Sequence, residues 1–166
     1  MKKHRTIDND ELMDRLSDEV NTAPDIRYHS IISHLYVEYY LNELISLKFV
    51  EAKLIIDEKE LGSFYNKFLI LKALGIFEHK DKLIENINLI TRIRNFYAHH
   101  LLISDELPEE VKSRITQLVY LDSEGNESDY DVPWDEHVDE YKTQLHVCAV
   151  STIGVLQQIV WDLEDK

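Results

Sequence analysis

Glycine and proline, the residues that most often interrupt helices and form turns, are scarce in this chain. Their scarcity limits the classes of fold that the chain can adopt. Only 4 Gly and 3 Pro occur among 166 residues. Folds made of many short strands need such residues at closely spaced turns, so a strand-rich sandwich or barrel is not expected. Apolar residues make up 44% of the chain, which is enough to fill a core without disulfides or a metal. The composition therefore favours an all-α domain.

Apolar residues recur at helical spacing along most of the chain. The pattern predicts helices at 8–20, 26–50, 61–74, 81–103, 108–118 and 134–163. Asp25 and Ser63 are expected to cap the second and third of these helices, and Gly75 to end the third. Gly154 is expected to interrupt the last helix softly. Residues 54–56 form either the end of a helix or a connector.

No internal repeat or low-complexity linker divides the chain, so residues 1–166 are expected to form a single domain. Its parts are an N-terminal helix and linker, a core, a short helix with an acidic loop, and a C-terminal helix, at 1–25, 26–103, 104–133 and 134–166. Within the core, Ile31 and Leu35 are expected on the apolar face of the long helix at 26–50. Residues 119–121 are a candidate for a brief strand. Short connections predict an antiparallel helical bundle.

The net charge of −14 is concentrated in one segment. Nine acidic residues and no Lys or Arg lie between Leu121 and Tyr141, whereas residues 1–120 hold 20 acidic residues against 16 Lys and Arg. An acidic surface repels nucleic-acid phosphates at long range. This argues against a sequence-specific reader of duplex DNA, although a local phosphate site is compatible with it. The acidic segment at 122–140 is either a solvated loop, or a mask or docking surface for a basic partner.

The single cysteine, Cys148, excludes a disulfide framework and metal sites built on paired cysteines. Proteins with a single unpaired thiol are typical of reducing compartments, so a cytoplasmic protein is expected. Cys148 itself is expected to be buried. The charged start does not resemble a signal peptide, and no run of about 18 apolar residues predicts a membrane span. The eight histidines lack a metal-ligand spacing, so no metal or other cofactor is expected.

The densest group of chemically useful side chains lies at 91–100, in the predicted helix 81–103. Arg94 falls on the apolar stripe of that helix, where an unpaired charge would be costly. In a structural interpretation, Arg94 reaches solvent or pairs with Glu38 or Glu43 of the long helix. In a functional interpretation, Arg94 faces a groove in which an anion binds.

In the functional interpretation, Asn95 adds an amide to the anion site and His99 moves a proton near neutral pH. Residues five apart lie about 140° apart around a helix, so Arg94 and His99 point in different directions within one copy. A long reach by Arg94, a deformed helix end, or two copies meeting at a dimer axis would bring them together. Arg92 and His99, seven apart, share a face of the helix.

Three segments, taken in order, add to this interpretation. Residues 94–99 read Arg-Asn-Phe-Tyr-Ala-His, and residues 34–45 place an acid before a Leu-x-x-Leu-Ile ridge. Gly62-Ser63-Phe64 is followed by Leu74-Gly75-Ile76. The first segment resembles the R-N-x-x-A-H form of the Arg-x4–6-His motif of the HEPN superfamily (higher eukaryotes and prokaryotes nucleotide-binding domains). The other segments resemble its second helix and its mannitol-repressor-like branch, and the resemblance covers about residues 30–102.

The resemblance implies an all-α domain that dimerises by pairing its motif helices across a cleft. Catalytic members of the superfamily are metal-independent endoribonucleases. One expectation is therefore that this chain is the toxin of a toxin–antitoxin or phage-defence pair, with an antitoxin as its protein partner. In that scheme Arg94 holds the scissile phosphate and His99 acts as general acid or base. Asn95 orients the phosphate or the Arg, and Glu38 fixes Arg94 from the neighbouring helix.

Three more residues of the motif helix are candidate binding or supporting groups: Tyr97, His100 and Arg92. Tyr97 faces either the cleft or the core. His99 and His100 are alternatives for the place in the cleft. Arg92 shares the face of His99.

The mannitol-repressor-like branch implies a different role. Its members are associated with transcriptional control without a recognisable DNA-binding motif. This chain also lacks a basic recognition helix, so such a role would run through a protein partner. In that case Arg94 and Asn95 would be structural. A nucleotide-binding or transferase-associated module is a third alternative.

Overall fold

The structure is a computed structural model that describes residues 9–23, 25–100, 106–129 and 139–165. Within these residues the chain is all-α, as the sequence predicts. An isolated β-bridge between Leu121 and Glu127 replaces the strand expected at 119–121. The helices are α1 (Asn9–Asn21), α2 (Ile26–Lys48), α3 (Ala52–Ile56), α4 (Phe64–Ala73), α5 (Asp81–His99), α6 (Glu109–Ile115) and α7 (Glu140–Glu164).

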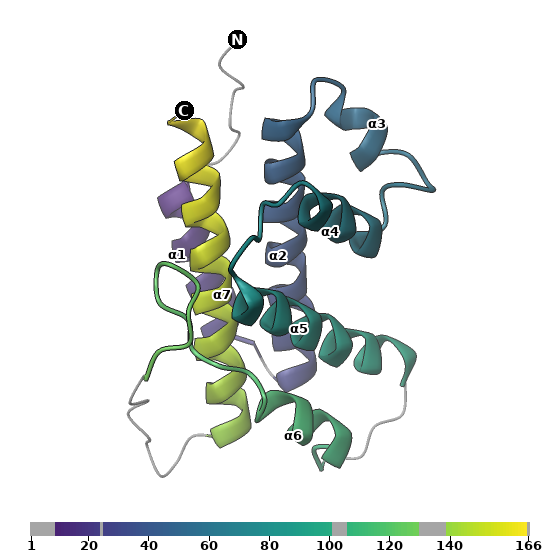
Figure 1. The fold of residues 1–166 in the computed structure, drawn as a ribbon. Helices are drawn as coiled ribbons and strands as arrows, with labels where there is room; N and C mark the ends of the chain where they lie inside the picture. The colour runs from purple at the N-terminus through teal and green to yellow at the C-terminus, as the bar shows by residue number, and fades with distance from the viewer. Residues whose placement is uncertain (1–8, 24, 101–105, 130–138, 166) are drawn as a thin grey trace.

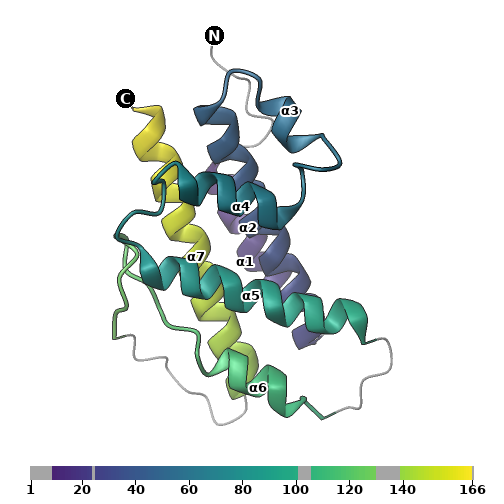
Figure 2. The same ribbon diagram turned by 45° about the vertical axis from the view of Figure 1, so that its right-hand side comes forward.

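The helices form two sets that cross each other. α1, α2 and α7 lie side by side, and α4 and α5 run across them, as Figure 1 and Figure 2 show. α2 packs against α1, α3, α4, α5 and α7, which makes it the central helix of the described part. α4 and α5 therefore both pack against α2.

The predicted antiparallel arrangement is wrong for the pair of longest helices, because α2 and α7 run in the same direction. Their first turns lie together: Lys142 Nζ donates to the carbonyl oxygen of Ala23 at 2.8 Å, and the rings of His29 and His146 stack at 5.5 Å. Short loops force neighbouring helices to be antiparallel. Here α6 and the residues around it intervene before α7, so the chain returns to the same end of the molecule (Figure 1).

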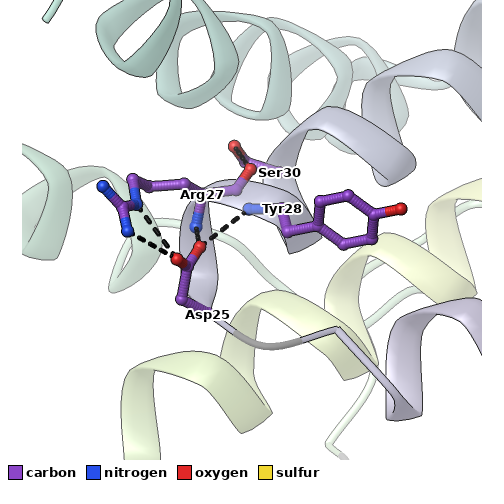
Figure 3. A network of polar contacts seen from close by, with 4 residues as sticks. All are labelled: Asp25, Arg27, Tyr28 and Ser30. Carbon is purple, nitrogen blue, oxygen red and sulfur yellow. Dashed lines mark hydrogen bonds and ion pairs between the residues drawn. The ribbon is translucent and has the colours of Figure 1, made fainter. Parts of the chain in front are cut away.

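Both predicted helix caps are confirmed. The Asp25 carboxylate accepts the backbone N–H groups of Arg27 and Tyr28 at 2.9 and 3.0 Å and also pairs with the Arg27 guanidinium (Figure 3). Ser63 Oγ accepts the backbone N–H of Asn66 at 3.3 Å. These contacts satisfy N–H groups that have no partner within the first turn of a helix.

Gly75 ends α4 as predicted. Its φ of +72° lies in the left-handed region, which glycine adopts at little cost. The N–H of Ile76 then bonds to the carbonyl of Leu71, and that of Gly75 to the carbonyl of Lys72. This pair of hydrogen bonds is a Schellman motif, and it turns the chain away from the helix axis.

The expected apolar face of α2 is only partly correct. Leu41 and Leu44 are fully buried, but Ile31 and Leu35 are 40% and 56% exposed. Crossing helices bury side chains all along one side of α2, and the stripe that carries Ile31 and Leu35 lies outside that side. Tyr28, three residues before Ile31, is exposed on the same stripe.

The last helix differs from its prediction at two points. It begins at Glu140, with Asp139 as its N-cap, and Trp134 lies outside the described residues. Gly154 does not interrupt α7, which continues to Glu164. No neighbouring atom lies within 4 Å of the position that a Cβ on Gly154 would occupy.

A buried amide links α5 to α7. The Asn86 side chain donates to the carbonyl of Val119 at 2.7 Å and to Thr152 Oγ1 at 2.9 Å, and it accepts the N–H of Val119 at 3.2 Å. Ser151 Oγ accepts the N–H of Leu121 at 3.2 Å. Side chains therefore hold segment 119–121 between the two helices, since its sheet pairing within the described residues is limited to the single bridge.

Candidate anion site between helices α2, α4 and α5

α5 presents the motif residues at its C-terminal end. Its apolar stripe is buried through Leu83, Ile87 and Ile90, as the spacing predicts. Arg94 follows on that stripe and is half-buried, as is Asn95. The guanidinium of Arg94 therefore lies at the edge of the hydrophobic core.

Arg94 makes a single side-chain hydrogen bond among the described residues. Its Nη1 donates to Asn95 Oδ1 at 3.0 Å. No carboxylate of the described residues forms an ion pair with the guanidinium. A guanidinium has five N–H donors, so most of its bonding capacity remains for solvent or an anion.

Glu38 pairs with Lys67 of α4 and not with Arg94, which corrects the predicted contact. Lys67 Nζ lies 3.0 Å from Glu38 Oε1. Lys67 is only 4% exposed, whereas the Glu38 side chain is 30% exposed. Sequence reasoning missed Lys67, although a signal was available: Lys67 lies one turn from Phe64 and Leu71 on the inner face of a short apolar helix.

His34 is the second residue that sequence reasoning did not single out. It lies one turn before Glu38, is 4% exposed, and its ring contacts that of Phe64 at 4.3 Å between centroids. Burial lowers the pKa of His34 to about 4; the positive charge of Arg94 adds to this lowering, and Glu38 opposes it. The imidazole is therefore neutral at pH 7.

These four residues form what we call the three-helix cluster: His34, Glu38, Lys67 and Arg94. At pH 7 it contains two cations, one carboxylate and a neutral imidazole. One positive charge is left over, at Arg94, in a chain whose net charge is −14. A local excess of this kind attracts an anion at short range even on an acidic protein.

The other candidate residues lie outside this cluster. His99 is exposed at the end of α5. His100 is held in place, since its Nδ1 lies 2.6 Å from the Phe96 carbonyl and its ring stacks on Phe96 at 4.1 Å. Arg92 is exposed, and its carbonyl accepts a hydrogen bond from Arg114. Within one copy, the half-buried Arg94 guanidinium acts electrostatically on His34 of α2, while His99 is exposed.

Tyr97 belongs to the core, with 7% exposure. Burial raises the pKa of its hydroxyl to about 12, with smaller effects from Asp25, Arg27 and Asp139. The hydroxyl has no hydrogen-bond partner among the described residues. The electrostatic effects of Asp25 and Arg27 on Tyr97 indicate that it lies near the start of α2, one turn beyond Arg94.

Cys148 is buried in α7, as expected, with 2% exposure. Burial raises the pKa of the thiol to about 12. A thiol of this kind is almost entirely protonated at neutral pH and is a poor nucleophile. Cys148 is therefore not a candidate catalytic nucleophile.

Three surface cavities in the described part lie away from the cluster. The two larger ones have volumes of about 460 Å³; one is lined by polar groups that include Glu78, Glu124 and Asp162, and the other lies around Val50. The third, of about 250 Å³, lies beside Cys148. None of the motif residues lines these cavities.

Two further features of the described residues concern metal ligands and membrane-spanning helices. These residues contain no group of three or more His, Cys, Asp or Glu side chains placed to hold a metal ion. None of their helices combines the length and apolar character that a membrane crossing requires.

The fold and site define an all-α protein with a local cationic site at the junction of three helices. Comparison of the chain with models of known protein families, with curated proteins and with solved structures found no match.

Proposed function

We propose that this chain is an RNA-binding domain of HEPN type, located in the cytoplasm, that cleaves RNA without a metal. The observation that carries the proposal is the state of Arg94: a half-buried guanidinium on the motif helix with no carboxylate partner among the described residues. Guanidinium groups bind phosphate through paired, charge-assisted hydrogen bonds. A phosphate of an RNA backbone is the ligand that this group fits best.

In the proposed mechanism, Arg94 and Asn95 hold the phosphate and stabilise the charge that develops on it. His99 accepts the proton of the attacking 2′-hydroxyl or donates a proton to the leaving oxygen. Because Arg94 and His99 face different directions in one copy, the proposal includes a homodimer in which each motif helix supplies one of the two groups. The symmetry of such a dimer would give two equivalent sets of residues.

The test is incubation of the purified chain with total cellular RNA in EDTA, next to Arg94→Ala and His99→Ala. We expect each substitution to lower cleavage at least roughly a hundredfold, the usual scale for losing a general acid or a charge-stabilising donor. Arg94→Ala is expected to fold, because Glu38 keeps its Lys67 partner. Cleavage at the wild-type rate by either folded variant would contradict the proposed site.

A second candidate function is a protein-interaction module that acts in transcriptional regulation. The observation in its favour is that the exposed large apolar side chains of the described part all come from one stretch of the chain, 28–74. They are Tyr28, Ile31, Leu35, Val50, Leu54, Leu61, Tyr65, Leu69 and Leu74. Exposed apolar side chains that form a contiguous patch are typical of surfaces that bind other proteins, and we infer that some of these side chains form such a patch.

The same RNA assay separates the two candidates. A well-folded wild-type chain that neither binds nor cleaves RNA would contradict the first candidate and favour the second. In that case Leu35→Ser, which removes an exposed apolar side chain without touching the three-helix cluster, is expected to weaken capture of a protein partner and to leave folding intact.

A further inference from the structure

We propose that Lys67 is a positioning residue of the anion site: by holding the Glu38 carboxylate, it keeps Arg94 available for a phosphate. This inference rests on the proposed function, since it concerns the residue that keeps the same anion site available. It involves side chains from three helices, Lys67 of α4, Glu38 of α2 and Arg94 of α5.

The first step of the argument is the difference in burial between the two cations. The Lys67 side chain is 5% exposed, so its ammonium group has almost no access to water. A buried charge without a counter-charge is strongly destabilising. Arg94 is only half-buried, and water can solvate its guanidinium. The carboxylate therefore lowers the free energy of the folded chain more when it pairs with Lys67.

The second step is that Glu38 lies close enough to act on the surroundings of Arg94. Both the Glu38 carboxylate and the Arg94 guanidinium act electrostatically on the imidazole of His34, which lies one turn before Glu38 on α2. Glu38 is also 30% exposed and can change rotamer. Without Lys67, the remaining cation of the three-helix cluster is Arg94, and the carboxylate would turn towards it.

The third step is the consequence for binding. A carboxylate paired with Arg94 would occupy the N–H donors that a phosphate needs. It would also cancel the single excess positive charge of the three-helix cluster. Lys67 thus acts on the ligand through Glu38, without touching the ligand itself.

The experiment measures binding of a short single-stranded RNA in EDTA by fluorescence anisotropy, for the wild type and for Lys67→Met. Met matches the length of the lysine stem and removes its charge. We expect the substitution to weaken binding roughly tenfold, the scale of one lost charge-assisted hydrogen bond. Thermal unfolding checks that the variant folds. If it does not, Lys67→Leu replaces it, because leucine also removes the donor to Glu38 and suits the apolar inner face of α4.

The decisive variant is Lys67→Met combined with Glu38→Gln. Removing the carboxylate leaves Arg94 unpaired again, so binding is expected to recover to within about twofold of the wild type. A role of Lys67 in stability alone would not produce this recovery. Failure of the double variant to recover, or full binding by folded Lys67→Met, would overturn the inference.

Arg94→Ala separates this inference from the proposed function. Loss of RNA binding in Arg94→Ala together with full binding in Lys67→Met would overturn only the role of Lys67. Full binding in Arg94→Ala would overturn the proposed function itself, whatever Lys67→Met shows.

Discussion

The imidazole of His34 lies between α2 and α4, in contact with the ring of Phe64 and near the charge of Arg94. Two features of this environment lower the pKa of His34: burial disfavours the charged imidazolium, and the positive charge of Arg94 repels it. The unfolded chain has neither constraint, and there the pKa of the imidazole returns to about 6.5. Protonation of this single side chain is therefore coupled to unfolding.

We expect acid to destabilise the chain through His34. Between pH 6.5 and pH 4, the unfolded chain binds a proton that the folded chain does not bind, so the free energy of unfolding falls as pH falls. The fall is about 3 kcal/mol and levels off below pH 4, where both states are protonated. Urea unfolding at pH 7 and pH 4.5 measures it, and His34→Gln should show a smaller difference between the two pH values.

Exposed His99 provides the matched control for this prediction. His99→Gln should keep the pH dependence of the wild type, because its side chain is exposed at the end of α5. His146 is partly buried and its pKa is lowered by burial, so some acid sensitivity should persist in His34→Gln. An unchanged pH dependence in His34→Gln would show that His34 does not contribute.

At the scale of an element, α4 depends on three consecutive residues that place its first turn. Gly62 allows a close approach of the backbone, Ser63 caps the helix, and Phe64 packs on His34. A Cβ at position 62 would lie 2.5 Å from the carbonyl oxygen of Ile56 and 2.7 Å from that of Glu58. The Gly-Ser-Phe segment therefore has a local physical role in placing Lys67 against α2.

Gly62→Ala is expected to destabilise the chain by about 1–3 kcal/mol, the usual cost of forcing extra atoms into a packed site. Gly154→Ala is the matched control, because that position lies inside α7 and has open space around it. The control should raise the free energy of unfolding by about 1 kcal/mol, since alanine favours a helix over glycine. Chemical denaturation of both variants measures the difference, and equal effects would contradict this account of Gly62.

At the scale of the whole molecule, the parallel arrangement of α2 and α7 requires the chain to travel back before α7 begins. The segment 119–121 lies on this return path, and the Asn86 amide fixes it against α5 and α7. Buried backbone groups need partners, and here a side chain supplies them in place of a sheet. One residue thus connects three parts of the fold.

Asn86→Leu is expected to lower the free energy of unfolding by about 2–4 kcal/mol, because it leaves the N–H and the carbonyl of Val119 without partners. Asn88→Leu makes the same change at an exposed position of the same helix. That control should shift stability by about 0.5 kcal/mol or less. Urea denaturation of both variants tests the prediction, and similar losses would argue against the role of Asn86.

Features that depend on a few neighbouring residues were determined by the sequence alone. The all-α class, the caps at Asp25 and Ser63 and the stop at Gly75 were predicted correctly, because helix periodicity, capping and a left-handed glycine act within about one turn of the chain. The position of Arg94 on the apolar stripe of α5 was also predicted from the sequence, because it depends only on the spacing of residues along one helix. The dimer and the RNA-binding role are predictions that these features alone do not test.

The tertiary structure decided which distant groups meet. It paired Glu38 with Lys67, whereas the sequence predicted Arg94 as the partner of Glu38 and did not single out Lys67. It also set the direction of α7 and exposed Ile31 and Leu35 on a helix whose apolar residues spread around much of its surface. Ion pairs and buried faces between helices depend on how the elements cross, and spacing along one helix carries no information about that crossing. The charge left over at Arg94, on which the proposed function depends, is therefore a property of the assembled helices.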